Sequence, residues 1–326
     1  MDMKPLGNTG IAVTPVGMGA MTIGHSRLAL SLEAGASVVR YALERGINFI
    51  DTAESYNAGH YVKRALKALA PAFSSGILPR PVVVSKSSAH GHDGMRRAVD
   101  QCRAAMDLDQ IDIFLLEGVR QAPDFAGRCG AWDCLQEAKA KGRVRAIGIS
   151  THDVDAAAEA VRVPGMDILF TLINYQGLGI SKGGGPGDRE DMEKAILEAS
   201  AQGIGVFTMR ALGGGSLARN YKEALDYASA LPGSASVMIG MGSGKDVDDA
   251  VAYFEGRLPE AFVPDAQRKH VFIDRGSCAG CGDCVRYCTS KAIRLDEEGI
   301  AAVDYNVCVL CGFCAPVCPS HALILL

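Results

Sequence analysis

Short apolar segments alternate with longer amphipathic segments along most of the chain, from Val13 to about Phe254. The apolar segments are rich in β-branched residues, which favours strands, and the stretches between them are rich in alanine, with apolar residues at helical spacing. Eight strands are predicted, at residues 13–19, 47–53, 82–87, 111–118, 144–150, 167–174, 203–212 and 236–241. The predicted helices include residues 37–46, 61–70, 95–108, 132–142, 192–203 and 245–256.

Eight strands that alternate with helices predict an α/β fold, a parallel (β/α)8 TIM barrel. A doubly wound open sheet is the alternative, but the first strand leads into GAMTIGHSR and not into a GxGxxG turn. The opening residues 3–13, MKPLGNTGIAV, are predicted to form a β-hairpin with NTG as its turn. Such a hairpin could plug the N-terminal face of the barrel.

The alternating pattern stops near residue 255, and the segment up to residue 272 carries two prolines and mixed charge. We therefore place the barrel at residues 1–258, a linker at 259–272 and a second domain at 273–326. A domain of about 55 residues is too small to build an ordinary hydrophobic core, so something else must hold it together.

Composition excludes several classes of protein. The chain has 326 residues, 48% of them hydrophobic, and a net charge of -4, which gives no reason to expect nucleic acid or an anionic membrane as a partner. The first residues contain no apolar signal-peptide region, and no apolar run approaches the roughly 18 residues of a membrane span. We expect a cytoplasmic protein.

The eleven cysteines are distributed unevenly. Cys102, Cys129 and Cys134 are scattered; the first and last are expected to be packing residues on helices, and Cys129 lies in a predicted loop. The other eight form two runs, CAGCGDCVRYC and CVLCGFCAPVC, each with the spacing Cys-x2-Cys-x2-Cys-x3-Cys.

This spacing is typical of two [4Fe–4S] clusters, in which the fourth cysteine of each run ligates the other cluster, as in a bacterial-type ferredoxin. A pair of zinc sites is the alternative, but it would leave the third cysteine of each run unused. The predicted ligands of the first cluster are Cys278, Cys281, Cys284 and Cys318. Those of the second are Cys308, Cys311, Cys314 and Cys288.

Polar residues at the C-terminal ends of the predicted strands indicate an active site, because TIM barrels carry their sites at that face. Strand two is followed by Asp51 and Tyr56, strand three ends at Lys86, and the apolar strand IDIFLL is followed by Glu117. A lysine beside a tyrosine stabilises the phenolate, so we expect the pKa of Tyr56 to be lowered and the phenol to act as a proton donor.

These motifs resemble the aldo-keto reductases, and the resemblance covers residues 1 to about 255. DTAESY matches the family's Asp-Thr-Ala-x-x-Tyr signature, so the resemblance makes Asp51, Tyr56 and Lys86 three members of the catalytic tetrad. With the cysteine runs, the chain is similar to the iron–sulfur branch of the family. The fourth tetrad member is normally histidine, and Glu117 stands in its place.

The exchange of histidine for glutamate occurs in a branch of the family that reduces the carbon–carbon double bonds of enones. A buried glutamic acid can hold its proton and donate a hydrogen bond to a carbonyl oxygen. The resemblance therefore implies reduction of a small α,β-unsaturated carbonyl compound, polarised by Glu117. Ordinary carbonyl reduction and a salt bridge between Glu117 and Lys86 in an altered site stay open.

The resemblance also implies a nicotinamide cofactor, NAD(P)H. VRAIGIST matches the strand that holds the carboxamide, and RALGGGSL the loop over the pyrophosphate. After strand eight the family often carries cations for the 2′-phosphate of NADPH, but Lys245 is followed here by Asp246, Asp248 and Asp249, which favours NADH or no nicotinamide. The implied cofactor-binding residues are Ser150, Thr151, Met209, Arg210, Leu212, Gly213, Gly242, Ser243 and Lys245.

Other polar features are less specific. His90 and His92 follow strand three and are possible alternative proton donors, and His152 follows Ser150 near the predicted site. The glycine-rich segment 177–191 lacks the lysine spacing of a phosphate-binding loop and is interpreted as a loop over the substrate.

Three hypotheses follow for the whole chain. The first is a nicotinamide-dependent reductase with an attached ferredoxin-type domain, acting on a small molecule and exchanging electrons with a partner such as a ferredoxin or flavoprotein. The second is a reductase that receives single electrons from the clusters without nicotinamide. The third is a non-catalytic electron-transfer or sensor protein.

Overall fold

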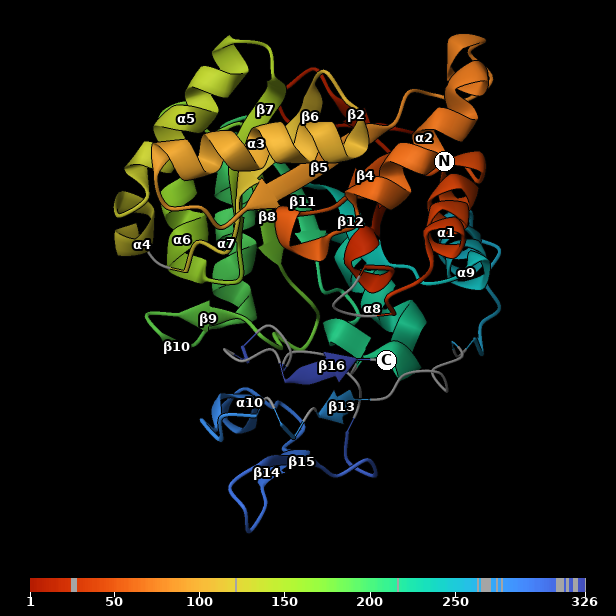
Figure 1. Ribbon diagram of the computed structural model, residues 1–326. Coiled ribbons are helices and arrows are strands. Elements are labelled where there is room, and N and C mark those ends of the chain that lie inside the picture. The colour runs from red at the N-terminus through yellow and green to blue at the C-terminus, as the bar shows by residue number, and fades with distance from the viewer. Residues whose placement is uncertain are drawn as a thin grey trace.

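The computed structural model contains a closed eight-stranded parallel barrel (Figure 1). It describes residues 1–24, 28–120, 122–215, 217–262, 264, 271–273, 275–276, 278–308, 314, 317–318 and 322–325. Around the barrel the strands follow chain order, and β12 pairs with β3 to close the ring. The predicted TIM barrel is confirmed, and the open sheet is wrong. The strands are β3 (Val16–Gly19), β4 (Phe49–Asp51), β5 (Val82–Ser87), β6 (Ile111–Leu116), β7 (Val144–Thr151), β8 (Ile168–Leu172), β11 (Gly205–Met209) and β12 (Ser234–Gly240).

Helices surround this barrel on the outside. The described α-helices of this part are α1 (Leu32–Glu44), α2 (Gly59–Ser74), α3 (His92–Met106), α4 (Ala122–Ala126), α5 (Cys129–Ala140), α6 (Val154–Ala160), α7 (Arg189–Ala201), α8 (Tyr221–Ala230) and α9 (Gly244–Phe254). Short 3-10 helices are η1 (Ala20–Thr22), η2 (Glu54–Tyr56), η3 (Gly213–Gly215) and η4 (Ala218–Asn220). None of the described helices is both long and apolar enough to cross a membrane.

Two apolar cores result from the alternation of side chains along each strand. Along β5, Val82 and Val84 point into the barrel, while Val83 points toward the helices. The interior is filled by aromatic rings: the Phe170 and Phe207 rings stack with centroids 4.2 Å apart. The strands are therefore buried on both faces, which explains their almost continuous apolar sequence.

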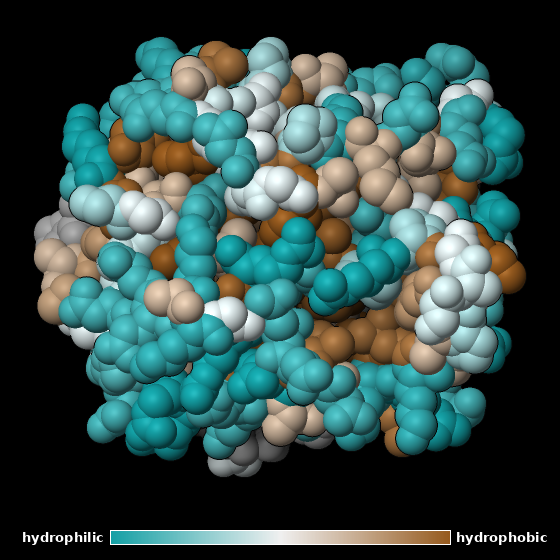
Figure 2. All heavy atoms as spheres, turned by 90° about the horizontal axis from the view of Figure 1, so that it is seen from above, coloured by the Kyte–Doolittle hydropathy of each residue, from teal (hydrophilic) through white to brown (hydrophobic). Residues whose placement is uncertain are grey.

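The predicted N-terminal hairpin is present as β1 (Lys4–Pro5) and β2 (Ala12–Val13), paired antiparallel. Leu6, Ile11 and Val13 are buried among the interior barrel residues, so the hairpin closes the barrel at the end where the strands begin. The Asn8 N–H donates to the Gly203 carbonyl at 2.8 Å, just before β11. Figure 2 shows this end of the molecule, where hydrophilic side chains cover most of the surface and apolar ones show between them.

A separate unit follows the barrel. It contains β13 (Val271–Ile273), α10 (Asp283–Arg286), β14 (Ile293–Leu295), β15 (Ala301–Val303) and β16 (Leu323–Leu325). β13 pairs with β16, and β14 pairs with β15. In Figure 1 this unit lies beyond the C-terminal ends of the barrel strands, at the opposite end from the β1–β2 hairpin.

The structure describes residues on both sides of the predicted linker, 259–272. β13 begins at Val271, so the boundary predicted at residue 273 falls inside a strand. At the other edge, Leu258 packs against the barrel core, and so does Phe262 inside the predicted linker, where its ring contacts the Tyr221 ring on α8. Proline content and mixed charge do not show which apolar residues of such a segment pack on a core.

The glycine-rich segment after β8 contains a small hairpin, β9 (Ser181–Lys182) with β10 (Gly185–Pro186). Asp153 holds it to the end of β7, because Ser181 Oγ donates to Asp153 Oδ2 at 2.9 Å. The segment therefore lies at the C-terminal end of the barrel, as expected for a loop near a substrate.

Candidate active site

Adjacent strands bring the two most buried charged groups of the site together. Asp51 ends β4 and Lys86 lies near the end of β5, and both side chains are almost completely buried. Lys86 Nζ donates to Asp51 Oδ1 at 2.6 Å and to the Thr52 carbonyl at 2.9 Å. Burial opposes the charge on Lys86, but Asp51, Tyr56 and Glu117 together raise its pKa, so Lys86 is an ammonium ion that Asp51 holds in place.

Tyr56 lies directly against this pair. Lys86 Nζ is 4.5 Å from the centroid of the Tyr56 ring. The prediction of a lowered pKa for this phenol is wrong, because burial raises the pKa of Tyr56 to about 12. Lys86 does lower this pKa, as expected, but burial outweighs its effect. The charges of Asp51 and Glu117 raise the pKa further. Sequence showed the cation but not the depth of burial, and burial is the larger effect.

Glu117 directly follows β6 and is half-buried at the same end of the barrel. Burial raises the pKa of Glu117, and the negative charges of Asp51 and Glu54 raise it further. The positive charges of Lys86 and Arg128 lower this pKa but do not cancel the rise. In the described part of the chain the carboxyl group forms no hydrogen bond or ion pair, and Lys86 pairs with Asp51 instead. The simple salt bridge between Glu117 and Lys86 is therefore not what the structure contains.

The main chain of Glu117 is held firmly. Its N–H donates to the Ser87 carbonyl at 2.8 Å, and the next N–H, of Gly118, donates to Ser150 Oγ at 3.2 Å. On the other side, Arg128 Nη1 donates to the Glu117 carbonyl at 2.9 Å. Glu117, whose carboxyl group has no partner among the described residues, therefore stands on a backbone that cannot easily move.

Ser150 and Thr151 end β7 beside this carboxylate and are almost completely buried. The Ser150 oxygen accepts from Gly118, but its hydroxyl hydrogen has no acceptor among the described residues. Thr151 Oγ1 donates to the Val119 carbonyl at 2.5 Å. Ser150 can therefore donate to a ligand acceptor such as a carboxamide oxygen, while Thr151 is already committed to the protein.

The loop after β11 contains the next group of predicted cofactor residues. Met209 ends the strand and packs against both cores. Arg210 has φ 63°, in the left-handed region, and its carbonyl accepts from the Gly213 N–H at 2.7 Å. Gly213 has φ 56°, and Leu212 packs partly buried on the outer core.

The loop after β12 is closed by its own acidic residue. Asp246 Oδ2 accepts from the Gly242 N–H at 2.8 Å, and Ser243 Oγ accepts from the Asp246 N–H at 3.2 Å as the N-cap of α9. Lys245 Nζ lies 2.7 Å from Asp249 Oδ2. A carboxylate already occupies this helix N-terminus, so the residues do not fit a 2′-phosphate group.

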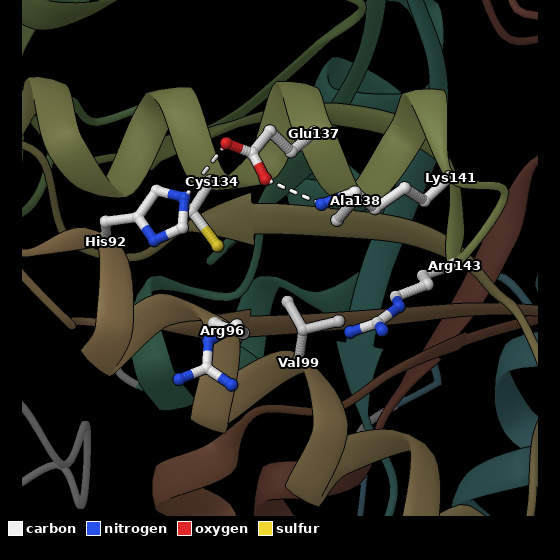
Figure 3. A pocket seen from close by; sticks show the side chains of 8 residues that line it. All are labelled: His92, Arg96, Val99, Cys134, Glu137, Ala138, Lys141 and Arg143. Atoms are coloured by element: carbon white, nitrogen blue, oxygen red, sulfur yellow. Dashed lines mark hydrogen bonds and ion pairs between the residues drawn. The ribbon is translucent and has the colours of Figure 1, made fainter.

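The predicted histidines lie in different environments. His90 is exposed, and His152, after β7, is at the mouth of the barrel. His92 begins α3, and its Nε2 is 3.2 Å from Glu137 Oε1 on α5. Figure 3 shows this ring in a pocket between the two helices, with Arg96, Lys141 and Arg143. His92 therefore faces α5 and not the Tyr56 hydroxyl.

Two of the three scattered cysteines have the environments of packing residues. Cys102 and Cys134 are buried on α3 and α5. Burial raises the pKa of Cys102 to about 11, and Ser85 Oγ lies 3.3 Å from its sulfur. Cys129 is exposed at the start of α5.

The cysteines of the C-terminal unit gather in its small core. Cys284, Cys314 and Cys318 are buried there, while Cys278, Cys288 and Cys308 pack against the same core and Cys281 is exposed. Burial raises the pKa of the Cys284 thiol, and the neighbouring sulfur atoms of Cys318, Cys278 and Cys281 raise it further. These four are the residues predicted to share the first cluster. Cys311 lies outside the described residues.

The contacts of these sulfur atoms fit iron–sulfur clusters. The Ala292 N–H donates to Cys288 Sγ at 3.1 Å and the Ala301 N–H to Cys278 Sγ at 3.5 Å, as backbone amides do toward cluster thiolates. Within the described residues no three His, Cys, Asp or Glu side chains are placed to hold a single metal ion.

Comparison with known proteins agrees with this geometry. A sequence profile of the Aldo/keto reductase family matches residues 15–230. The chain belongs to this family. A profile described as a 4Fe-4S dicluster domain matches residues 277–322, so this aldo-keto reductase carries an iron–sulfur domain after its barrel.

Individual relatives cover only part of the sequence. A D-threo-aldose 1-dehydrogenase from Pseudomonas sp is 27% identical over 192 residues, 51% of this chain and 58% of that enzyme. The chain spans about half the length of the curated relatives it matches.

Solved structures share the barrel fold. An aldo-keto reductase from Bacillus halodurans, in its holo form, has a TM-score of 0.63 at 20% identity and covers 82% of this chain and 99% of that one. An aldo-keto reductase from Bombyx mori in complex with NADP has a TM-score of 0.57 at 19% identity and covers 79% of this chain and 89% of that one.

Two residues of this aldo-keto reductase site had no signal in the sequence. Arg128 is 2% exposed and joins two loops, because Nη1 donates to the Glu117 carbonyl and Nη2 to the Ala89 carbonyl at 3.4 Å. Glu54 Oε2 accepts from Ser87 Oγ at 2.5 Å and ties η2, which carries Tyr56, to β5. Neither stands at a strand end, so only the folded contacts reveal them.

Proposed function

We propose that this aldo-keto reductase reduces a small α,β-unsaturated carbonyl compound. Tyr56 gives a proton, Lys86 and Asp51 hold the phenol and stabilise charge beside it, and Glu117 donates a hydrogen bond from a neutral carboxyl group to the carbonyl oxygen. The observation that carries the proposal is the carboxyl group of Glu117, which has no partner in the described part of the chain and lies next to the Tyr56–Lys86–Asp51 group.

The chemistry follows from the charge of each group. At neutral pH Tyr56 keeps its proton because burial holds its pKa high, so the phenol is a hydrogen-bond donor to the bound substrate. Negative charge that develops on the substrate oxygen would be stabilised by the Lys86 ammonium in this dry site. Glu117, with its raised pKa, supplies a second neutral donor, which favours an enol-like arrangement of the substrate.

A nicotinamide cofactor, when bound, supplies hydride, and we propose NADH. Ser150 has a hydroxyl hydrogen available for the carboxamide, and the Arg210–Gly213 loop is the segment implied for the pyrophosphate. The related fold from Bombyx mori was solved in complex with NADP. At the start of α9, however, Asp246 takes the Gly242 N–H that a 2′-phosphate would need, and its charge would repel that phosphate.

Iron–sulfur clusters supply single electrons, and their ligand unit lies at the catalytic end of the barrel in Figure 1. This position favours a second candidate function, a reductase fed with single electrons by the clusters, with Tyr56 and Glu117 as proton donors. Either function allows an external electron-carrier protein as a partner. A non-catalytic sensor would have no use for the buried Lys86–Asp51 pair.

The test is turnover and binding with anaerobically purified, full-length protein. Saturable NADH binding, tighter than NADPH binding, and NADH-dependent reduction of an enone support the main proposal. Tyr56→Phe should lower kcat by about 10²–10⁴-fold and leave the NADH Kd nearly unchanged. Enone reduction with a reduced one-electron donor, and none with NADH, would support the second candidate instead.

A further inference from the structure

The mouth of the barrel carries three basic residues, and the function proposed above uses only one of them, Arg210, in the loop implied for the cofactor pyrophosphate. Arg120 follows β6, His152 follows β7 and Arg210 follows β11. All three lie at the C-terminal ends of barrel strands, the face that carries Tyr56 and Glu117. Arg120 and His152 are exposed, and Arg210 is half-buried.

Arg120 and His152 start from neighbouring points of the backbone. The pairing of β6 with β7 continues beyond the strands, because the Val119 N–H donates to the Ser150 carbonyl at 3.0 Å. Thr151 Oγ1 then donates back to the Val119 carbonyl at 2.5 Å. Arg120 and His152 are the next residue of each segment, so the two residues leave the barrel from neighbouring points of the backbone.

Arg210 approaches the same place from the other side of β8. β11 pairs with β8 as far as Met209, and β8 pairs with β7 as far as Thr151. Arg210 has φ 63°, a conformation that favours glycine and that is retained for other residues mainly where the surrounding structure requires it.

Both arginines act on the imidazole of His152. Desolvation by the surrounding protein lowers the pKa of His152, although the residue is partly exposed, and the charges of Arg210 and Arg120 lower it further. No carboxylate contributes to this effect. At neutral pH the cluster therefore has two permanent positive charges and a neutral imidazole within their reach.

The charge of Arg120 has little internal compensation. In the described part of the chain no side chain pairs with the Arg120 guanidinium; Asp124 accepts from its backbone N–H at 3.1 Å and lies 3.7 Å from Arg128. A positive potential at the mouth of a cleft attracts anions. Arginine is also the side chain best suited to carboxylates and phosphates, because its planar fork donates two parallel hydrogen bonds.

We propose that Arg120, His152 and Arg210 form a subsite for an anionic group of the substrate, a carboxylate or a phosphate. The proposal rests on the proposed function and narrows it to anionic unsaturated carbonyl compounds. Arg120 is only three residues after Glu117, so the subsite borders the group that polarises the carbonyl oxygen. The substrate would be held at both ends, with its double bond between them.

The test compares two substrates that differ only in charge, an unsaturated carbonyl compound with a carboxylate and its primary amide, using the full-length protein. Arg120→Gln should raise KM for the carboxylate by about 10- to 100-fold and leave KM for the amide nearly unchanged. Arg162→Gln, an exposed arginine at the end of α6 that pairs with Glu159, is the matched control and should change neither KM. Equal effects on both substrates, or none, would overturn the proposal.

The cofactor pyrophosphate is the other anion that these arginines could serve, so the NADH Kd is measured for each variant. If Arg210→Gln weakens NADH binding but leaves the ratio of KM values for the two substrates unchanged, Arg210 binds the cofactor and is not part of the subsite. Direct calorimetric binding of inorganic phosphate separates this proposal from the proposed function. If phosphate binds to the wild type and Arg120→Gln abolishes that binding, the subsite is supported even when neither substrate turns over. If phosphate does not bind and the enzyme does not discriminate between the carboxylate and the amide, the subsite is refuted.

Discussion

At the scale of single residues, the chemistry of this site depends on how protein burial and neighbouring charges compete. Lys86 is kept charged although it is buried, because three groups with negative or potentially negative charge surround it. Glu117 is pushed toward its neutral form although the same lysine opposes this. One cation therefore contacts the Asp51 carboxylate at 2.6 Å and only partly offsets the effect of burial on the pKa of Glu117.

Glu117 should control the choice between double-bond and carbonyl reduction. Glu117→His restores the residue usual in the family, and we expect loss of enone reduction with a gain for the matched saturated ketone. The raised pKa of Glu117 means that the neutral donor persists above the usual range and is lost as pH rises through that pKa. Wild-type activity should accordingly fall on the alkaline side, and steady-state rates against pH on both substrates check this.

Glu117→Gln serves as the control for that experiment. Its amide still donates a hydrogen bond but does not titrate, so the alkaline fall assigned to Glu117 should disappear while part of the enone activity remains. If Glu117→His keeps the wild-type preference between the two substrates, the carboxyl group does not determine the reaction.

Arg128 should act as a positioning residue for Glu117. Arg128→Met removes two hydrogen bonds to loop carbonyls and also a positive charge that lowers the pKa of Glu117. We expect kcat to fall by about 10-fold or more, since each lost hydrogen bond from a charged group contributes roughly 1.5–3 kcal/mol. The alkaline limb of the pH profile should move to higher pH. Arg128→Lys keeps the positive charge, so the alkaline limb of its pH profile should stay where it is in the wild type. If the alkaline limb of Arg128→Met does not move either, Arg128 does not act on Glu117 in this way.

The polar residues at the strand ends could be predicted from the sequence, because barrel topology places them on one face. What the sequence could not give was the balance of forces among them. Tyr56 was expected to have a lowered pKa from its lysine neighbour, yet desolvation is larger. Arg128 and Glu54 act through main-chain carbonyls and a serine, and such contacts leave no spacing pattern in the sequence.

At the scale of elements, close approach of strand backbones determines where side chains are not tolerated. A Cβ atom added at Gly148 on β7 would lie 2.0 Å from the Ile168 carbonyl oxygen on β8. Gly148→Ala should therefore force these two strands apart, and overpacking of this kind costs about 1–3 kcal/mol, or more when backbone must move. Thermal unfolding of the variant should show a clear fall in Tm.

Gly91→Ala is the matched control for this change. Gly91 precedes α3 with φ -106°, and nothing lies within 4 Å of an added Cβ atom. Its effect on stability should stay within about 0.5 kcal/mol. Equal Tm values for the two variants would show that β7 and β8 are not held at this distance in solution.

Element prediction succeeded where the apolar pattern was long and failed where it was short. The strand predicted at residues 82–87 has the same bounds as β5, because it is a continuous run of buried residues. Among the described helices of the barrel, α4, α6 and α8 are absent from the predicted set. α6 spans only seven residues and is mostly alanine, so it offers no contrast between a polar and an apolar face.

At the scale of the whole molecule, the two parts depend on different sources of stability. The barrel has two extensive apolar cores, whereas the core of the C-terminal unit is small and includes Cys284, Cys314 and Cys318. So small a core is held by its clusters. Removing iron with a chelator under oxidising conditions should therefore unfold the C-terminal unit and leave the barrel intact.

Hydrogen exchange followed by mass spectrometry checks this prediction. Amides of β13–β16 should lose protection without iron, while those of β6 and β7 should keep it. Intact protein should carry close to eight irons and matching sulfide, and stoichiometric zinc without sulfide would exclude the clusters. Loss of protection in the barrel as well would show that the two parts unfold as one.

The pairing of β13 with β16 has a consequence for the order of events during synthesis. These strands are the first and the last elements of the C-terminal unit, and Cys318 of the second run lies beside thiols of the first. The unit can close only once residues 323–325 have emerged from the ribosome, whereas all residues of the barrel core emerge earlier. The closed unit therefore forms after the barrel sequence is complete, and a chain that stops between residues 318 and 323 would carry the predicted cluster cysteines without the strand that pairs with β13.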